Sequence, residues 1–535
     1  MYSSQMLDFI KTVEATREDR FKNEPRRLDA NEKQALLKEF HPDHRDSGFG
    51  TIEVGNNKGE KAPVELVELL HANSRIKGIK FDFDSPKYDV DVLIIGGGGA
   101  GASAAIEAKK AGANVMIATK LRMGDANSTM AEGGIQAADN ENDSPQQHYL
   151  DSMGGGHYAN KPELLKRLVM DGPDAIHWLE NLGVMFDKKT DGSMVTFPGG
   201  GLSRNRLHAC ADYTGLEITR VLINEVRNLD VPIVDFTAAL ELIMDDKGKV
   251  AGAVLMNMLT GEYVIAKAKT VIVATGGAGR LHYHGFPTTN HYGATADGLI
   301  LAYRVGASLL YQDTIQYHPT GVAYPTQLFG ALVTEKVRSI GAQLVNIEGE
   351  AFVHPLETRD VVSSAIIREC GQRKKGITTP DGAGVWLDTP LIVKKSGASM
   401  IEKSIPGILK MFLNYGIDIR KLPILMYPTF HYQNGGIDIE KGGHTKEVQN
   451  LFMAGEVVGG IHGRNRLLGN SMLDVVVFGR HAGKAAAEAA KTTTIGKLTL
   501  NHVDEYTRKL KDAGIDNDKT SPLLLPNYVR KLHKA

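Results

Sequence analysis

Residues 88–120 read YDVDVLIIGGGGAGASAAIEAKKAGANVMIATK, and this stretch decides the fold of the chain. Val90–Ile95 is a short apolar run of the kind that forms a buried parallel strand, and the Ala-rich segment that ends at Ala111 has the composition of a helix. Between them the glycines at 96, 98 and 101 make the pattern G-x-G-x-x-G. A strand, a glycine turn and a helix in this order predict a dinucleotide-binding βαβ unit.

Each glycine of this turn has a physical task. Gly96 permits the tight turn, Gly98 lets the backbone approach a pyrophosphate, and Gly101 lets the helix pack on the strand. Free N–H groups and the dipole at the helix N-terminus favour the anion. Asn114–Thr119 then completes the unit as a second strand. The turn by itself does not say which dinucleotide binds.

Composition limits the possible classes of protein. A chain of 535 residues is too long for one simple core, so two or three structural units are expected. The formal net charge of −1 gives no support to binding of nucleic acid or of an anionic membrane surface. Cys210 and Cys370 are the only cysteines, which excludes a disulfide framework and a four-cysteine iron–sulfur cluster.

No targeting segment is visible. Residues 1–27 alternate in charge and lack the apolar core of a signal peptide. The chain also lacks an apolar run of about 18 residues, the length that a transmembrane helix needs. We therefore expect a cytoplasmic protein whose membrane association, if any, passes through a partner.

The chain divides by composition into several parts. Residues 1–87 are densely charged, with predicted helices at Asn31–Phe40 and Pro63–Ala72 around an irregular segment at His41–Lys61. Further along, polar and irregular sequence with helices at Val361–Arg373 and Ile401–Tyr415 predicts an inserted second domain. The predicted bounds are 1–87 for an N-terminal extension, 88–314 and 428–490 for the nucleotide-binding domain, 315–427 for the insertion, and 491–535 for a C-terminal tail.

Short-range patterns predict further elements. Helices are expected at Pro162–Leu182, Ser471–Ala490 and Val503–Lys511, and a strand that ends in glycines at Leu451–Gly460. Short apolar segments with Asp-Lys-Gly and Thr-Gly-Glu turns predict antiparallel hairpins. These strands are Val231–Phe236, Ala239–Met244, Val250–Asn257 and Glu262–Ala266, and Thr270–Gly279 is predicted as another buried strand.

A series of motifs identifies the family that the chain resembles. In chain order they are AEGG (131–134), ATGGAG (274–279), QYHPTG (316–321), VTEKVR (333–338), TRDVVS (358–363), HYQNGG (431–436), AGEVVGGIHGRNRLLGNS (454–471) and VVFGRHAG (476–483). Over roughly residues 88–490 the chain resembles the flavoprotein subunits of fumarate reductase and succinate dehydrogenase. The resemblance implies an α/β fold in which a Rossmann-type FAD-binding domain is interrupted by an α+β capping domain, here with an N-terminal helical extension.

The resemblance also implies FAD as the cofactor. Thr119-Lys120 matches the Ser/Thr-Lys pair that follows the second strand in such flavoproteins, where a nicotinamide enzyme more often has an acidic residue. By the resemblance, Asp297 contacts the cofactor, Glu456 binds the adenosine ribose, and Ser471 and Met472 lie beside the isoalloxazine. The other expected FAD contacts are Gly96, Gly98, Gly99, Ala100 and Gly101 in the turn, Asn127, Ser128, Thr129, Ala131, Glu132, Gly133 and Gly134 in the loop that wraps the flavin, and Ala239 and Arg466.

One position in this loop departs from the respiratory members of the family. They attach FAD covalently through a histidine in a run that resembles S-H-T-V-A-A-E-G-G, and Asn127 takes the place of that histidine here. An amide cannot form the histidyl linkage, so we predict non-covalent FAD.

Reduction of a C=C bond between two carboxylates requires a hydride, a proton and cations that hold the dicarboxylate. Flavin N5 gives the hydride. By the resemblance, Arg359 donates the proton, and Glu335 and Arg338 form the relay that replaces it. The intrinsic pKa of arginine is above about 12, so it can act as an acid only with such a relay in a closed site. The expected substrate ligands are His318, Thr334, Glu335, His431 and Arg466, and His318 is also counted among the catalytic residues.

Other departures leave alternatives open. Arg338-Ser339-Ile340-Gly341-Ala342 stands where the family often has R-G-E-G-G, Gln433-Asn434 replaces T-M or M-M, and Arg464 and Leu468 replace smaller residues. The alternative enzyme is an L-aspartate oxidase or a reductase of another enoate, and the alternative from another class is a flavin subunit that only transfers electrons. Fumarate reduction is the expected direction, since covalent FAD in this family favours the higher potential that succinate oxidation needs.

Electrons must also reach the flavin. The chain has no C-x-x-C-H haem motif and no set of cluster ligands. We therefore expect the partner to be a separate iron–sulfur or other redox subunit, with the N-terminal extension as a candidate docking element.

Overall fold

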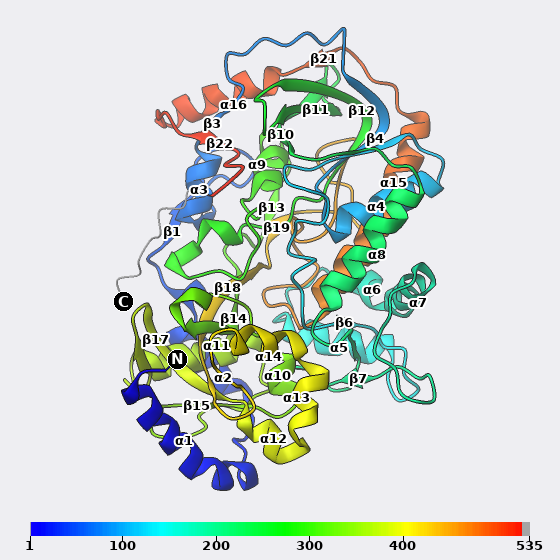
Figure 1. The fold of residues 1–535 in the computed structure, drawn as a ribbon. Coiled ribbons are helices and arrows are strands. Elements are labelled where there is room, and N and C mark those ends of the chain that lie inside the picture. Colours follow the sequence, from blue (N-terminus) through cyan, green and yellow to red (C-terminus); the bar gives the residue numbers. More distant parts are fainter. Residues whose placement is uncertain (1, 527–535) are drawn as a thin grey trace.

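A computed structural model describes residues 2–526, and Figure 1 shows two main sheets, one containing β10, β11, β12 and β4 and the other containing β14, β17 and β18. In the larger sheet five strands run parallel, because β4 pairs with β5 and β12, β5 pairs with β9, and β12 pairs with β20. Their bounds are β4 Tyr88–Ile95, β5 Val115–Ala118, β9 Ile233–Val234, β12 Tyr263–Val273 and β20 Leu451–Met453. This confirms the predicted Rossmann-type fold.

Helices cover a face of this sheet. α4 (Gly99–Lys110) follows the glycine turn, and α8 (Thr214–Asn228) and α15 (Asn470–Thr492) lie beside it in Figure 1. A Cβ on Gly483 of α15 would lie 2.3 Å from the backbone oxygen of Ala104, so glycine is what permits the close packing of α15 on α4. The predicted helix at Ser471–Ala490 therefore closes the nucleotide domain.

An antiparallel part extends the same sheet and corrects two predictions. β10 (Thr237–Asp245), β11 (Val250–Asn257) and the first half of β12 form the expected hairpins. β9, however, is not part of a hairpin, because it pairs in parallel with β5 at the sheet edge. Glu262–Ala266 and Thr270–Val273 belong to the single strand β12, since Lys267 and Lys269 do not interrupt it but pair with Asp89 and Asp91 of β4.

The second sheet belongs to a separate hydrophobic core, and with its helices it is called the capping domain below. Its strands are β14 Ile315–Tyr324, β15 Gln343–Val345, β16 Ile377–Thr379, β17 Gly382–Asp388 and β18 Ile424–Gln433, and its helices are α10 Lys336–Ser339, α11 Arg359–Cys370, α12 Pro390–Ser396, α13 Ala398–Ser404 and α14 Pro406–Leu413. The α+β capping domain that the resemblance implied is confirmed, although the local sequence pattern indicated only its helices and left its strands as irregular sequence. The predicted bounds of the domains stay predictions.

Proline accounts for two helices that were predicted as single and are divided. Ile401–Tyr415 is broken at Ile405, the residue before Pro406, because the α conformation is disfavoured before proline. Pro162–Leu182 is divided into α6 (Pro162–Met170) and α7 (Gly172–Leu182), with Pro173 in the first turn of the second helix, where its missing N–H is tolerated.

The N-terminal extension packs on both domains. α1 (Ser4–Lys22) and α2 (Ala30–Phe40) lie against the capping domain in Figure 1, with Met6, Ile10 and Leu36 in its core. The segment predicted as irregular contains a turn of 3-10 helix at Pro42–His44 and the strand β1 (Phe49–Thr51). Next come β2 Lys61–Pro63, α3 Val64–Leu70 and β3 Asn73–Ser74, which lie on the nucleotide-binding side.

The remaining elements connect these parts. They are α5 Pro145–Gly155, the three-stranded sheet of β6 Ile135–Gln136, β7 Thr196–Phe197 and β8 Leu207–His208, α9 Asp297–Arg304, the pair β13 Leu309–Leu310 and β19 Gly436–Ile437, β21 Leu498–Thr499, α16 Asn501–Asp512 and β22 Thr520–Ser521. α16 confirms the helix predicted in the tail, of which residues 527–535 lie outside the described residues. Within residues 2–526, every helix falls short of the length and apolarity needed to span a membrane.

Candidate functional site

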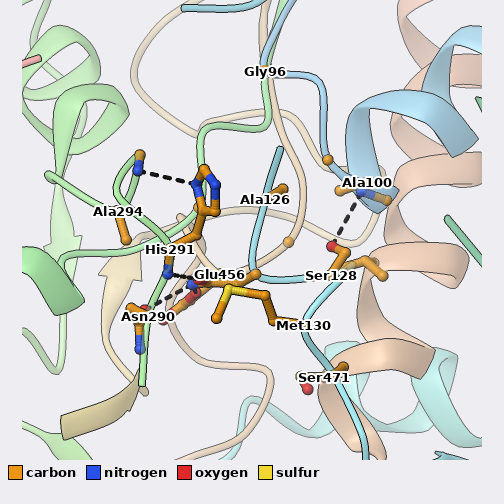
Figure 2. Close-up of a pocket in the computed structure, with 18 of the residues that line it drawn as sticks. Gly96, Ala100, Ala126, Ser128, Met130, Asn290, His291, Ala294, Glu456 and Ser471 are labelled. Atoms are coloured by element: carbon orange, nitrogen blue, oxygen red, sulfur yellow. Dashed lines mark hydrogen bonds between the residues drawn. The ribbon is translucent and has the colours of Figure 1, made fainter. Parts of the chain in front are cut away.

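One long pocket joins the two domains. Its lining includes residues of both domains. The glycine turn, Lys120 and Ala239 line one end, and His318, Arg359 and Arg466 line the other. Figure 2 shows the part between these ends, with Ala100 and Ser128 on one side and Asn290, His291 and Glu456 on the other.

The glycine turn forms a backbone cradle. A Cβ on Gly101 would lie 2.0 Å from the backbone oxygen of Gly96, so only glycine lets α4 start directly on β4. Gly98 caps α4 without a side chain, and Gly99 N–H donates to Ser128 Oγ at 3.1 Å. The helix N-terminus thereby faces the pocket with N–H groups that suit a pyrophosphate.

A second wall follows β5, where this fold binds the ribose of the adenosine half of a dinucleotide. Lys120 Nζ donates to Thr295 Oγ1 at 2.6 Å and to Asp297 Oδ2 at 2.5 Å. It also donates to the backbone oxygen of Leu524 at 2.6 Å. Lys120 is thus held in place at the pocket wall.

Asn127 organises the middle of the pocket. Its Nδ2 donates to Asn290 Oδ1 at 2.7 Å and to Glu456 Oε2 at 3.2 Å, and its Oδ1 accepts from His291 N–H at 2.6 Å. Burial raises the pKa of Glu456, whose Oε1 accepts from the Gln433 N–H. The expected contact of Glu456 with the adenosine ribose stays a prediction. Sequence reasoning missed Asn290 and His291, although they lie just before residues 293–298, the run GATADG that contains Asp297.

The capping end gathers buried arginines around two acceptors. Glu335 Oε2 accepts from Arg359 Nε at 2.9 Å and lies 3.3 Å from Arg338 Nη2. Gln316 Oε1 accepts from Arg359 Nη1 and from Arg466 Nη2, both at 2.9 Å. Sequence reasoning missed Gln316, although it stands two residues before His318 in the QYHPTG motif.

The protonation states at this end follow from burial. Burial, with Arg359 nearby, places the pKa of His318 and of His431 well below the ordinary value, so both rings are neutral at pH 7. Burial alone would raise the pKa of Glu335, but the two arginines beside it lower it overall, and it stays ionised. The His318 and His431 rings lie 4.8 Å apart, and Thr289 Oγ1 lies 2.7 Å from His431 Nδ1.

Arg466 is a cation without a carboxylate partner among residues 2–526. Its guanidinium lies 4.4 Å from the centre of the Tyr432 ring, and its Nε has no hydrogen-bond partner among the described residues. Burial, and then the charge of Arg359, lowers its pKa to about 9. Arg338 and Arg359 both contact the carboxylate of Glu335. Glu456 and Glu335 lie near enough to Arg466 to favour its charged form, but neither forms an ion pair with it.

The structure brings most of the predicted site residues together. All of them line the pocket except Gly101, Thr129, Glu335 and Arg338. Gly101 and Thr129 support the wall from behind, where Thr129 Oγ1 donates to the backbone oxygen of Gly124. Glu335 and Arg338 lie behind Arg359, and Arg338 is anchored on the backbone oxygen of Pro355.

The departures from the family pattern lie mostly outside the pocket lining. Arg464 forms an ion pair with Asp313 and stacks on Tyr311. Asn434 donates to the backbone oxygen of Arg464. Leu468, in contrast, lines the pocket and fills space beside Gly133. Leu468 is therefore, with Asn127, a departure with direct access to a ligand.

Comparisons with known proteins agree with this site. Residues 91–472 match the family model described as an FAD binding domain. The chain is 39% identical to a subunit of the fumarate reductase (CoM/CoB) of Methanothermobacter marburgensis over 84% of this chain and 81% of that protein. It is 34% identical to L-aspartate oxidase of Streptomyces coelicolor over 79% of this chain and 72% of that protein. It superposes on a quinol-fumarate reductase with a TM-score of 0.72, at 32% identity, over 79% of this chain and 75% of the other.

The pocket residues fit the cofactor that these comparisons indicate. The cradle has no side chain where a pyrophosphate must approach, and the walls continue without interruption from Lys120 to Arg359. FAD is the cofactor of the family that the chain matches.

Proposed function

Because the chain belongs to the family of fumarate reductase and succinate dehydrogenase flavoproteins, we propose that it interconverts fumarate and succinate and acts as a fumarate reductase. The observation that carries this proposal is the charge at the capping end, where Arg338 and Arg359 contact the one carboxylate of Glu335 and buried Arg466 has no ion-pair partner among the described residues. Burial of unbalanced cations is costly unless a ligand neutralises them. A dicarboxylate brings the negative charge that can pair with Arg466.

Each residue then has a task that its contacts support. Arg466 grips one carboxylate through its planar guanidinium, and neutral His318 and His431 donate hydrogen bonds to the substrate. The side-chain oxygen of Gln316 accepts hydrogen bonds from both Arg359 and Arg466. It thereby fixes the distance between Arg359, the proton donor, and Arg466, which binds a substrate carboxylate. When bound, FAD supplies the hydride.

Proton delivery runs through the buried ion pairs. Arg359 gives a proton to the substrate carbon, and the Glu335 carboxylate, which contacts its Nε, takes a proton from Arg338 and passes it to Arg359. Arg338 stands next in line on Glu335. Closure of the pocket over the substrate would exclude water and leave this relay as the source of the proton.

Anaerobic reoxidation tests the proposal. Purified protein with reduced FAD is mixed with fumarate, and the absorbance of oxidised flavin is followed with time. We expect rapid recovery in the wild type and recovery slower by about 10²–10⁴-fold in Arg359→Gln. Arg464→Gln is the matched control, because this arginine pairs with Asp313 outside the pocket lining. Equal rates in the wild type and Arg359→Gln, or no reoxidation at all, would remove the proposal.

The same preparation separates the alternatives. L-aspartate carries an ammonium group that needs an acceptor, and Glu335 is already engaged by two arginines. We therefore expect that L-aspartate does not reduce the oxidised flavin. Its reduction would favour an L-aspartate oxidase instead, and a flavin that responds to neither compound would favour an electron-transfer subunit.

The attachment of FAD is part of the proposal. The Asn127 amide is held by Asn290, Glu456 and the backbone of His291, and an amide has no nucleophilic nitrogen to bond a flavin. Acid precipitation should release the yellow colour into the supernatant. Flavin fluorescence on the denatured polypeptide band would contradict non-covalent binding.

A separate redox subunit completes the proposal. The support comes from the relatives, one of which is named as one subunit of its enzyme. α1 of the N-terminal extension exposes Leu7 and Phe21 on its outer side, which keeps the extension a candidate docking element. Copurification should recover a protein with an iron–sulfur or other redox centre. Purification without one, together with full activity on NADH alone, would refute this part.

A further inference from the structure

We propose that the C-terminal segment 520–525 is part of the FAD site, as a strap that holds the adenosine half of the cofactor in place. The segment lies beyond residues 91–472, which match the FAD-binding family model. The proposal depends on FAD as the cofactor and not on the reaction that the capping end performs.

The strap is anchored on the N-terminal extension. β22 pairs in parallel with β3, so that Thr520 aligns with Asn73 and Ser521 with Ser74. Arg75 donates from Nε to the backbone oxygen of Pro522 at 2.5 Å and from Nη2 to that of Leu523 at 3.2 Å. The C-terminal segment thus meets the last part of the N-terminal extension on the nucleotide-binding side, where Figure 1 shows β22 beside β3.

A buried arginine fixes the strap from the other side. Arg304, in α9, donates to the backbone oxygen of Ser521 at 3.0 Å and to its Oγ at 2.6 Å. Ser521 is fully buried, and Arg304 also pairs with the buried Glu241 at 2.9 Å. A segment with this many charge-assisted hydrogen bonds has a defined position rather than a loose one.

The strap ends on residues of the pocket wall. The backbone oxygen of Leu524 accepts from Lys120 Nζ at 2.6 Å and from Thr295 Oγ1 at 3.2 Å. Leu524 N–H donates to Asp297 Oδ1 at 3.3 Å. Lys120 and Asp297 both line the pocket, so one residue of the tail contacts two groups of the FAD wall.

The side chain of Leu524 adds packing to these hydrogen bonds. It is buried in a cluster with Ile76, Ala238 and Leu240, and Ala238 also lines the pocket. The φ of Leu524 is +68°, a conformation that is unusual for any residue other than glycine. Contacts on both sides of the chain must therefore hold it there.

These contacts bear on the adenosine half rather than on the flavin. Lys120 directly follows β5, the point where this fold meets the ribose. Without Leu524 the Lys120 ammonium group would lose one of the three acceptors that orient it. Ala238 would also lose the apolar side chain that packs in the same cluster. Because the pocket wall is already ordered, little conformational entropy is lost when FAD binds. Loss of this order should therefore weaken FAD binding.

Truncation of the chain tests the strap. Three proteins are stripped of FAD and compared: the full chain, a chain that stops after Lys519, and a chain that stops after Pro526 as the control that keeps the strap. The affinities for FAD, for ADP as a probe of the adenosine half, and for FMN as a probe of the flavin half are measured by titration. Arg75→Gln in the full chain is the second variant, for the case that the short chain does not fold.

We expect the chain that stops after Lys519 and Arg75→Gln to bind FAD and ADP with a Kd raised about tenfold or more, or about 1.4 kcal/mol. FMN binding should stay within about twofold of the full chain, and the chain that stops after Pro526 should match the full chain for all three probes. An unchanged Kd for FAD in Arg75→Gln and in any folded short chain would overturn the proposal. A loss of FMN affinity as large as that of ADP would overturn it as well. Since no fumarate is present, a failure of the proposed activity leaves this result unaffected.

Discussion

The two ends of the pocket are built on different principles. The cofactor end is rich in glycine, alanine and backbone N–H groups between Gly96 and Gly134, with a few polar side chains such as Lys120 and Asp297 on its walls. The capping end consists of buried charged side chains, which come from β14, α11 and the loop before α15. Shape and backbone recognise the cofactor, while charge and hydrogen bonding prepare the site for the substrate. A change at the first end should therefore affect FAD content, and a change at the second should affect turnover with FAD still bound.

The largest effect is expected from Gly101→Val. The first added carbon would lie 2.0 Å from the Gly96 backbone oxygen, so α4 must move away from β4. We expect the protein to be purified without FAD, with a Kd for FAD raised at least about a hundredfold, or about 2.8 kcal/mol. Gly154→Ala in α5 is the matched control, because its Cβ would meet only Tyr158 Oη at 3.9 Å. Full FAD content in Gly101→Val would break the comparison at the cofactor end.

Glu335→Gln should separate turnover from binding. The amide cannot pass a proton to Arg359, so kcat should fall by about 10²–10³-fold. KM should not rise, because the loss of a negative charge leaves the arginines more positive toward a dicarboxylate. Steady-state kinetics and the FAD content provide the readout. Glu357→Gln is the control, since this buried carboxylate pairs with Lys33 of the extension and lies outside the relay. A raised KM with unchanged kcat would assign Glu335 to binding alone.

Arg466→Lys is expected to have a smaller effect, on binding. Lysine keeps the charge but loses the planar pair of donors and the contact with Gln316. KM for fumarate should rise by about 10–100-fold, equivalent to about 1.4–2.8 kcal/mol. The reoxidation rate at saturating fumarate should change less than KM does. A variant with unchanged KM would show that the substrate carboxylates bind elsewhere.

The pH dependence should show the smallest effect. Arg466 has a pKa lowered to about 9, so raising the pH above this value removes a positive charge from the free enzyme. A dianion then binds less well, and kcat/KM for fumarate should fall about tenfold per pH unit above pH 9. FAD fluorescence over the same range checks that the cofactor stays bound. A flat profile up to pH 10 would show that this cation does not control binding.

Some of the architecture was predictable because its causes are local in the sequence. The glycine turn, β4 and α4 depend on side-chain sizes within about one βαβ unit. β12 was predicted as two strands because Lys267 and Lys269 interrupt its apolar pattern, and the aspartates that neutralise them lie in β4. Pro173 and Pro406 were visible in the sequence, but each was still placed inside one continuous predicted helix, and the structure divides both helices there.

The site shows the same division between features with local causes and features that depend on distant contacts. Arg359, Glu335, His318 and Arg466 were predicted from motifs, but their mutual contacts were not. Gln316 has no distinctive pattern of its own, and its importance appears only because two arginines converge on one oxygen. Asn290, His291 and Leu524 became part of the site in the same way, since each acts through a residue far away in the chain.

The sequence alone determined the dinucleotide fold, its glycine turn and the set of charged residues available for chemistry, because these depend on residue size and order within short segments. Only the tertiary structure decided which charges lack a partner, which amide bridges the arginines, and that the last described residues reach Lys120. These properties arise from burial and from contacts between segments hundreds of residues apart, and no local pattern contains them.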